Sequence, residues 1–295
     1  MKRIFILNFI TISIIMLLSL ISAPNSQEVS NHHLLIGFGT VIAFMSVLWL
    51  ISLIIKDASI VDIFWGPAFI VLGSSLLISM DQLYSERSLF ILFLVSLWAI
   101  RLASHIGFRN IGHGEDFRYV EWRNEGGKNY WWISFIRVFL LQGALCTLVG
   151  SSIYFGFLND EPLSFIEAML SSTIFFIGLA WESISDIQLQ RFKKDKSNKG
   201  KICKSGLWKY SRHPNYFGDL VVWISIFTFS ISSKNVLLIL GSFLSPLIMG
   251  AIFYYITGPI MDQAMMLSRP DYKKYMEESN SPVSYTHLTL PTIYS

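Results

Sequence analysis

The stretch LLIGFGTVIAFMSVLWLISLII, residues 34–55, contains no charged side chain. A bilayer-spanning α-helix needs about 20 mostly apolar residues, so this stretch is long enough to cross. Other apolar runs, each bounded by charged, Gly, Pro or Asn-containing segments, lie at residues 4–22, 60–79, 89–104, 133–157, 165–189, 217–233 and 236–257. The pattern therefore predicts an all-α, polytopic integral membrane protein with about eight transmembrane helices.

The composition supports this class. Of the 295 residues, 53% are hydrophobic and 15% are charged, and the mean hydropathy is +0.50. Soluble domains carry about 25% charged residues, so a lipid bilayer is expected to cover part of the apolar surplus. We predict no nucleic-acid partner, because topology explains the basic residues. We also predict no metal, because His32, His33 and His113 lack metal-ligand spacing.

The basic residues predict an orientation. With the N-terminus inside, all of the 23 Lys and Arg residues except Arg87 and Lys234 lie on one side. The positive-inside rule makes that side cytoplasmic. The expected location is therefore the bacterial inner (cytoplasmic) membrane, with several passes, both termini cytoplasmic, and large cytoplasmic loops at residues 105–132 and 190–216.

The two ends of the chain need separate interpretations. Residues 1–33 have a basic start and an apolar run, which resembles a signal peptide. The run is longer than the usual signal core, and Pro24 follows the possible cleavage point, so we favour a retained helix; cleavage would leave seven spans. Residues 34–281 form the expected membrane domain. The Thr-rich residues 282–295 are neither helical nor membrane-like in pattern, and we interpret them as a non-native or disordered tail.

One segment concentrates polar groups at the start of an apolar run. Residues 206–223 read GLWKYSRHPNYFGDLVVW, in which Pro214 interrupts the backbone and Gly218 permits close packing. Such a cluster at the mouth of a span is costly unless it binds something. On composition alone, an interfacial cap of aromatic and basic anchors is an equally good explanation. The polar residues are Tyr210, Arg212, His213, Asn215, Tyr216 and Asp219.

The run RHPNYFGD at 212–219 resembles the signature of the membrane reductase superfamily that includes sterol reductases and steroid 5-alpha-reductases. Over residues 35 to 280 the chain is most similar to a bacterial branch with a steroid 5-alpha-reductase C-terminal-like domain, the domain-of-unknown-function 1295 family. Isoprenylcysteine methyltransferases belong to the same superfamily. Further matching segments are DIFWG at 62–66, RLASHIGFRNIGHGEDFRY at 101–119, WESISDIQLQRFK at 181–193, and GP with RPDYKKY near the C-terminus.

This resemblance implies that NADPH binds in a cleft that opens to the cytoplasm. The charge and shape of the residues agree, because guanidinium groups and nearby lysines suit phosphates and an amide side chain suits a carboxamide. The sequence contains no Gly-x-Gly-x-x-Gly unit, so it gives no indication of a Rossmann domain. The cofactor-binding residues that the resemblance implies are Asp186, Gln188, Lys193, Arg212, His213, Asn215, Tyr216, Asp219, Asp262, Arg269 and Tyr272.

Catalytic and substrate-binding roles are assigned from chemistry. Tyr216 or Tyr210 could deliver a proton or polarise a carbonyl, and Glu182 could assist. Polar groups within apolar runs are functional candidates, so we expect a substrate pocket near Asp62, Trp65 and Gln142. The expected reaction is NADPH-dependent reduction of a carbon–carbon double bond in a lipophilic molecule, such as a steroid-, isoprenoid- or fatty-enone-like substrate.

Two alternatives stay open. Isoprenylcysteine and phospholipid methyltransferases share an Arg-His-Pro segment and use S-adenosylmethionine. They typically carry a Glu-Glu pair near the C-terminus, where this chain has Met261-Asp262-Gln263. The other alternative is a non-enzymatic membrane binding protein that keeps the fold. Direct cofactor binding would distinguish all three.

Overall fold

The computed structural model describes residues 31–110, 112 and 114–279. Within these residues the regular structure is entirely helical, which confirms the all-α prediction. The predicted first span at 4–22 and the tail at 282–295 lie outside the described residues. The chain divides into two compact units, which are described in turn. Unit 1 runs to Ser172 and includes Ile224–Pro246, and unit 2 comprises Thr173–Trp223 and the chain from Leu247 onward.

Six helical segments of the described chain are long and apolar enough to cross a membrane, which confirms the polytopic membrane class. Several continue beyond the predicted runs, because a helix keeps its backbone hydrogen bonds after the apolar side chains end. The six segments are His32–Ile55, Ile60–Ser79, Glu86–Asn110, Phe117–Val149, Phe165–Lys194 and Val236–Ser268.

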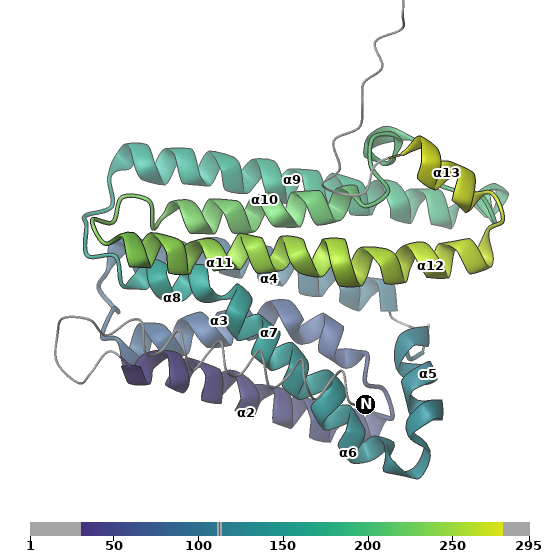
Figure 1. The fold of residues 1–295 in the computed structure, drawn as a ribbon, viewed down its shortest axis with the longest axis horizontal. Coiled ribbons are helices and arrows are strands. Elements are labelled where there is room, and N and C mark those ends of the chain that lie inside the picture. The colour runs from purple at the N-terminus through teal and green to yellow at the C-terminus, as the bar shows by residue number, and fades with distance from the viewer. Residues whose placement is uncertain (1–30, 111, 113, 280–295) are drawn as a thin grey trace, which may run out of the picture. The chain divides into compact units, whose positions relative to one another are not determined.

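Unit 1 is a bundle in which α3 packs against both α2 and α4 (Figure 1). The α3–α4 contact is close, since a Cβ atom on Gly66 would lie 2.8 Å from the carbonyl oxygen of Ala99. Beside it, the rings of Trp65, Phe69 and Trp98 meet edge to face. The helices of unit 1 are α2 (Asn31–Ile55), α3 (Ile60–Ser79), α4 (Glu86–Asn110), α5 (Phe117–Gly126), α6 (Tyr130–Ser134), α7 (Leu141–Val149), α8 (Ser151–Phe157), the start of α9 (Phe165–Lys194), the end of α10 (Pro214–Thr228) and the start of α11 (Val236–Ile252).

A buried ion pair in unit 1 joins the first turns of α4 and α9. Arg87 is 3% exposed and pairs with Glu167. Its guanidinium also donates to the carbonyl oxygens of Phe229, at 2.6 Å, and Glu161, at 2.9 Å. A buried charge needs such complete pairing. Arg87 is one of the two basic residues that the predicted topology leaves on the non-cytoplasmic side. Its ion pair and hydrogen bonds give it a structural role there.

Unit 2 contains the polar segment. Its elements are the rest of α9, the 3-10 turns η3 (Lys196–Asn198) and η4 (Gly206–Lys209), the start of α10, the end of α11, the π-helix η5 (Phe253–Thr257), α12 (Gly258–Ser268) and α13 (Tyr272–Glu278). The helix α10 begins at Pro214, three residues before the predicted run, because proline suits a first helical position where no N–H partner is required. The polar residues that follow therefore lie on the first turns of the helix.

The backbones of α9 and α10 touch in unit 2. A Cβ atom on Gly178 would lie 2.8 Å from both the Gly218 carbonyl oxygen and the Val222 nitrogen. A Cβ atom on Gly218 would collide with the backbone of Glu182. Glycine at both positions lets the helices approach without side chains between them, as in other close membrane helix pairs. This contact places the start of α10 directly against the middle of α9.

Candidate functional site

Asp262 on α12 is the centre of a buried polar cluster in unit 2. Its carboxylate accepts hydrogen bonds from the Tyr272 hydroxyl at 2.6 Å and from His213 Nε2 at 2.9 Å. Arg212 Nε lies 3.3 Å from the other carboxylate oxygen. Since a carboxylate only accepts, His213 must carry its proton on Nε2. We name Asp262, Arg212, His213 and Tyr272 the Asp262 cluster.

Arg212 also holds the C-terminal helix in place. Its Nη1 donates to the carbonyl oxygens of Met276, at 3.0 Å, and Ser279, at 2.7 Å. These carbonyls lie at the end of α13, where helical acceptors lack partners within the helix. Within the described chain, Arg212 forms its hydrogen bonds through Nε and Nη1, so the fork retains Nη2 for a further acceptor.

Tyr216 lies in a stack of three rings. Its ring centroid is 5.0 Å from that of His213 and 4.6 Å from that of Phe253, with interplanar angles of 11° and 1°. Phe253 begins the π-helix η5, an irregularity that is frequent at functional sites. The stack fixes the plane of the Tyr216 ring and joins it to the Asp262 cluster through His213.

Asn215 has an unsatisfied acceptor. Its Oδ1 atom is buried and has no hydrogen-bond partner among the described residues. Asn215 lies in the first turn of α10, two residues after His213. An unpaired buried amide oxygen costs on the order of 1–3 kcal/mol, so a ligand N–H that reached it would be stabilised.

Burial keeps two tyrosines of unit 2 protonated. The pKa of Tyr272 is raised well above its ordinary value, first by burial and then by its hydrogen bond to Asp262. Burial likewise raises the pKa of Tyr275 to about 12. The Tyr275 hydroxyl donates to the Trp208 carbonyl oxygen at 2.6 Å. Both hydroxyls therefore act as hydrogen-bond donors at neutral pH.

Tyr210 lies in a different setting from Tyr216. Its side chain is 66% exposed, and it borders a hollow of about 590 Å³ on α9 and η4. Gln188 also lines this hollow, and its Oε1 accepts a hydrogen bond from the Leu207 N–H at 2.9 Å. Among the described residues, no hydrogen bond or ring contact joins Tyr210 to the Asp262 cluster, so the two predicted catalytic tyrosines have separate surroundings.

The other predicted residues of unit 2 are distributed along α9, α10 and the C-terminal stretch. Glu182, Asp186 and Asp219 are buried carboxyl groups, and Glu182 lies at the close contact with Gly218. Arg269 is further out and donates from Nε to the Lys201 carbonyl oxygen at 3.0 Å. The last predicted cofactor residue of α9 is the exposed Lys193 in its final turn.

The predicted substrate residue Asp62 belongs to a second cluster, in unit 1. Its carboxylate accepts from the Tyr119 hydroxyl at 2.6 Å and from Arg118 Nη2 at 2.7 Å. Arg118 Nε donates in turn to Asp116 at 2.9 Å. Burial alone would raise the pKa of Asp116, but the hydrogen bonds and charge of Arg118 outweigh it and lower that pKa. We name these four residues the Asp62 cluster.

Trp65 and Gln142, the other predicted substrate residues, are also in unit 1. Trp65 is one helical turn from Asp62, and its indole N–H is buried with no hydrogen-bond partner among the described residues. Gln142 is half-buried on α7. Trp65 therefore offers a donor one helical turn from Asp62, whereas no hydrogen bond among the described residues links Gln142 to either residue.

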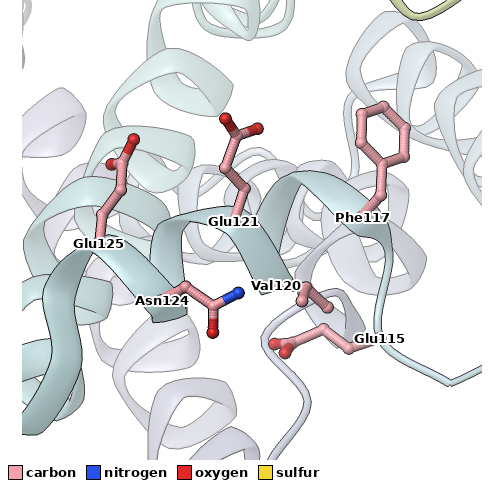
Figure 2. A pocket seen from close by; sticks show the side chains of 6 residues that line it. All are labelled: Glu115, Phe117, Val120, Glu121, Asn124 and Glu125. Carbon is pink, nitrogen blue, oxygen red and sulfur yellow. The ribbon is translucent and has the colours of Figure 1, made fainter.

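A further hollow, of about 550 Å³, lies along α5 in unit 1 and is shown in Figure 2. Glu121 and Glu125 project to one side of the helix, and Glu115 lies on the other. Two of these carboxylates are paired: Glu115 with Arg123 and Glu125 with Arg137, each at 2.7 Å. Within the described residues, no group of three metal-ligating side chains occurs here or elsewhere.

These features define an all-α membrane protein with an aspartate, arginine, histidine and tyrosine cluster that joins the start of α10 to α12 and α13. The chain belongs to the family described as "Protein of unknown function (DUF1295)", whose model matches residues 48–279. It is similar to Schizosaccharomyces pombe "Uncharacterized protein C594.04c", with 26% identity over 232 residues. That alignment covers 68% of this chain and 66% of the relative. No solved structure matches the chain.

Proposed function

We propose that the protein is a membrane-bound, NADPH-dependent reductase of a carbon–carbon double bond in a lipophilic substrate. The substrate would be steroid-, isoprenoid- or fatty-enone-like. This proposal places the family with the steroid 5-alpha-reductase-like superfamily. It also places the protein in a bacterial inner membrane, with the basic loop at 190–216 and the cofactor cleft on the cytoplasmic side.

The convergence of sequence-distant residues in the Asp262 cluster carries the proposal. Arg212 and His213 precede α10, Asp262 lies on α12 and Tyr272 begins α13, yet all four share one carboxylate. The resemblance had named each of them independently as cofactor-binding. An interfacial cap of anchoring side chains would need no such shared buried partner.

The residues present fit NADPH. The Nη2 group of Arg212 suits a phosphate oxygen, because a guanidinium fork forms charge-assisted hydrogen bonds. The buried Asn215 Oδ1 suits the N–H of a nicotinamide carboxamide, which would remove its unsatisfied state. The four side chains of the Asp262 cluster include one carboxylate and one guanidinium, so they carry no net negative charge that would repel an anion.

When bound, NADPH would supply hydride, and the protein's part is to bind, orient and handle the proton. Asp262 fixes the orientation of His213, which stacks on Tyr216 and limits its motion. Tyr216 would donate a proton to the substrate or polarise its carbonyl. The buried carboxyl group of Glu182, on the adjacent helix, would assist that transfer.

Direct titration tests the proposal. The full chain, purified in detergent, is titrated with NADPH, NADH and S-adenosylmethionine by calorimetry. We expect the parent and Tyr216→Phe to bind NADPH alike. Turnover should be reduced in Tyr216→Phe only. Absence of nicotinamide binding would overturn the proposal. Binding of S-adenosylmethionine alone would move the protein to the methyltransferase class.

The orientation has its own test. Reporter fusions after Lys199 and after Asp160 should report opposite sides of the membrane, with Lys199 cytoplasmic. The same side for both fusions would remove the basis for a cytoplasmic cleft, whatever the titration shows.

A further inference from the structure

The hollow beside Tyr210 follows one face of α9. Ile177, Trp181, Ile184 and Gln188 recur every three or four residues, so they lie on one stripe of the helix. From the first to the last of them the stripe is about 16 Å long, at 1.5 Å per residue. Ala180, with its small side chain, also lines the hollow and leaves room within it.

The apolar side chains of this stripe are exposed on the surface of the protein. Ile177 is 55% exposed and Ile184 is 47% exposed, although α9 is one of the helices long and apolar enough to cross a membrane. Hydrocarbon is therefore the medium expected against these side chains. A hollow of about 590 Å³, rather than a flat helix face, gives a single chain a defined position there.

Polar groups occur at one end of the hollow. Gln188, Lys209 and Tyr210 line that end, and the Lys209 ammonium lies 5.9 Å from the centre of the Tyr210 ring. Lys209 forms no ion pair with another described residue. The last turn of α9 is basic. The acidic residue that follows it, Asp195, accepts a hydrogen bond from the Ser197 N–H at 2.9 Å.

We propose that this hollow is a binding site for an anionic phospholipid of the membrane. One acyl chain would lie along Ile177, Trp181 and Ile184, and the phosphate would meet the Lys209 ammonium. The Tyr210 hydroxyl would donate to a phosphate or ester oxygen. The apolar stripe that ends at the Lys209 ammonium matches the layout of such a lipid, since basic groups at the interface attract anionic headgroups.

The hollow lies outside the Asp262 cluster, which carries the proposed reduction. It gives Tyr210 a lipid-binding role, and leaves proton transfer to Tyr216. None of the residues that form the Asp262 cluster lines the hollow. A change in lipid binding should therefore leave NADPH binding intact, and the two proposals can fail separately.

Tryptophan quenching by brominated lipids tests the site. The full chain is reconstituted in phosphatidylcholine vesicles that contain a minor fraction of phosphatidylglycerol, with bromine on the chains of one lipid or the other. The difference between the parent and Trp181→Phe isolates the Trp181 signal. We expect brominated phosphatidylglycerol to quench that signal several-fold more than brominated phosphatidylcholine at the same mole fraction.

Three variants locate the contacts. Lys209→Gln should lower the preference for phosphatidylglycerol by about fivefold, the effect of one basic residue near an anionic surface. Lys273→Gln, an exposed lysine of α13 outside the hollow, should leave the preference unchanged. Ala180→Phe should fill the hollow and abolish the selective quenching. All three should bind NADPH like the parent.

Several outcomes would overturn the proposal. Equal quenching by the two lipids would mean only a non-specific lipid annulus. An equal loss in Lys273→Gln would mean general surface attraction. Competition by glycerol phosphate at the same concentration as phosphatidylglycerol in detergent would mean a phosphate site without a lipid chain.

Discussion

The Asp62 and Asp262 clusters share three residue types, aspartate, tyrosine and arginine, but differ in their balance of positive and negative charges. In each, an aspartate accepts from a tyrosine hydroxyl at 2.6 Å and pairs with an arginine. In the Asp62 cluster, one guanidinium serves two carboxylates, those of Asp62 and Asp116. In the Asp262 cluster, one carboxylate serves a guanidinium and an imidazole.

This difference separates a cluster with a surplus of carboxylates from one without such a surplus. Two carboxylates against Arg118 leave a negative balance, so a phosphate near them would be repelled. One carboxylate against the Arg212 guanidinium leaves no net negative balance in the Asp262 cluster. Similar geometry therefore does not imply similar function, and under the proposed function the count of charges favours the Asp262 cluster for a phosphorylated cofactor.

Removing each aspartate charge gives the largest expected contrast. Asp262→Asn leaves Arg212 buried without a carboxylate, and should cost about 3 kcal/mol of unfolding free energy. Asp62→Asn should cost less, about 1–2 kcal/mol, because Arg118 keeps Asp116. Thermal unfolding in detergent measures both, and an Asp62→Asn variant less stable than Asp262→Asn would contradict the charge count.

The arginines should differ in cofactor binding. If Arg212 meets a phosphate, Arg212→Ala should weaken NADPH binding by roughly tenfold to a hundredfold, equivalent to about 1.5–3 kcal/mol. Arg212→Lys should recover only part, because the fork is lost. Arg118→Ala is the matched control and should leave NADPH affinity unchanged. Equal losses in both alanine variants would show that folding, rather than contact, explains the effect.

Alkaline stability sharpens the comparison further. Below pH 10 the Tyr272 hydroxyl is protonated in both the folded and the unfolded chain. Above pH 10 this hydroxyl ionises in the unfolded chain, while the raised pKa keeps it protonated in the folded chain. Stability should therefore fall with rising pH, by about 1.4 kcal/mol per pH unit for this tyrosine. Tyr272→Phe should flatten the melting-temperature curve between about pH 10 and pH 11.5. Tyr84→Phe, at a site 93% exposed, should leave it unchanged.

Asn215→Ala should have the smallest effect. It removes a neutral contact, so NADPH binding should weaken by about twofold to tenfold. The stability of the chain without cofactor should not fall, because the Oδ1 atom has no partner to lose among the described residues. A lower melting temperature without cofactor and an unchanged affinity would assign Asn215 a structural role instead.

Much of the fold could be predicted from the sequence, because apolar runs report directly on membrane helices. The predicted run at 60–79 coincides with α3. The run predicted at 217–233 is α10, which spans Pro214–Thr228, because proline begins the helix among polar residues that hydropathy excludes. The run predicted to end at 257 continues through η5 to Ser268, since the backbone hydrogen bonds outlast the apolar side chains.

The site could be predicted in part. The resemblance selected Arg212, His213, Asp262 and Tyr272, but nothing in the sequence predicts that they share one carboxylate. Phe253 was missed, because a phenylalanine in an apolar run gives no signal of stacking on Tyr216. Tyr119, the partner of Asp62, was missed for a related reason: the two are separated by 57 positions, and a pairing at that distance depends on tertiary structure.

The contact between Gly178 and Gly218 has a consequence for how this family can vary. Each glycine meets backbone atoms, which cannot move aside as a flexible side chain can. Even alanine would push α9 and α10 apart, and the first turn of α10 would move with its helix. In a saturation-mutagenesis library selected for activity, these two positions should therefore tolerate almost no replacement. The exposed Ile177 beside them should accept most apolar residues.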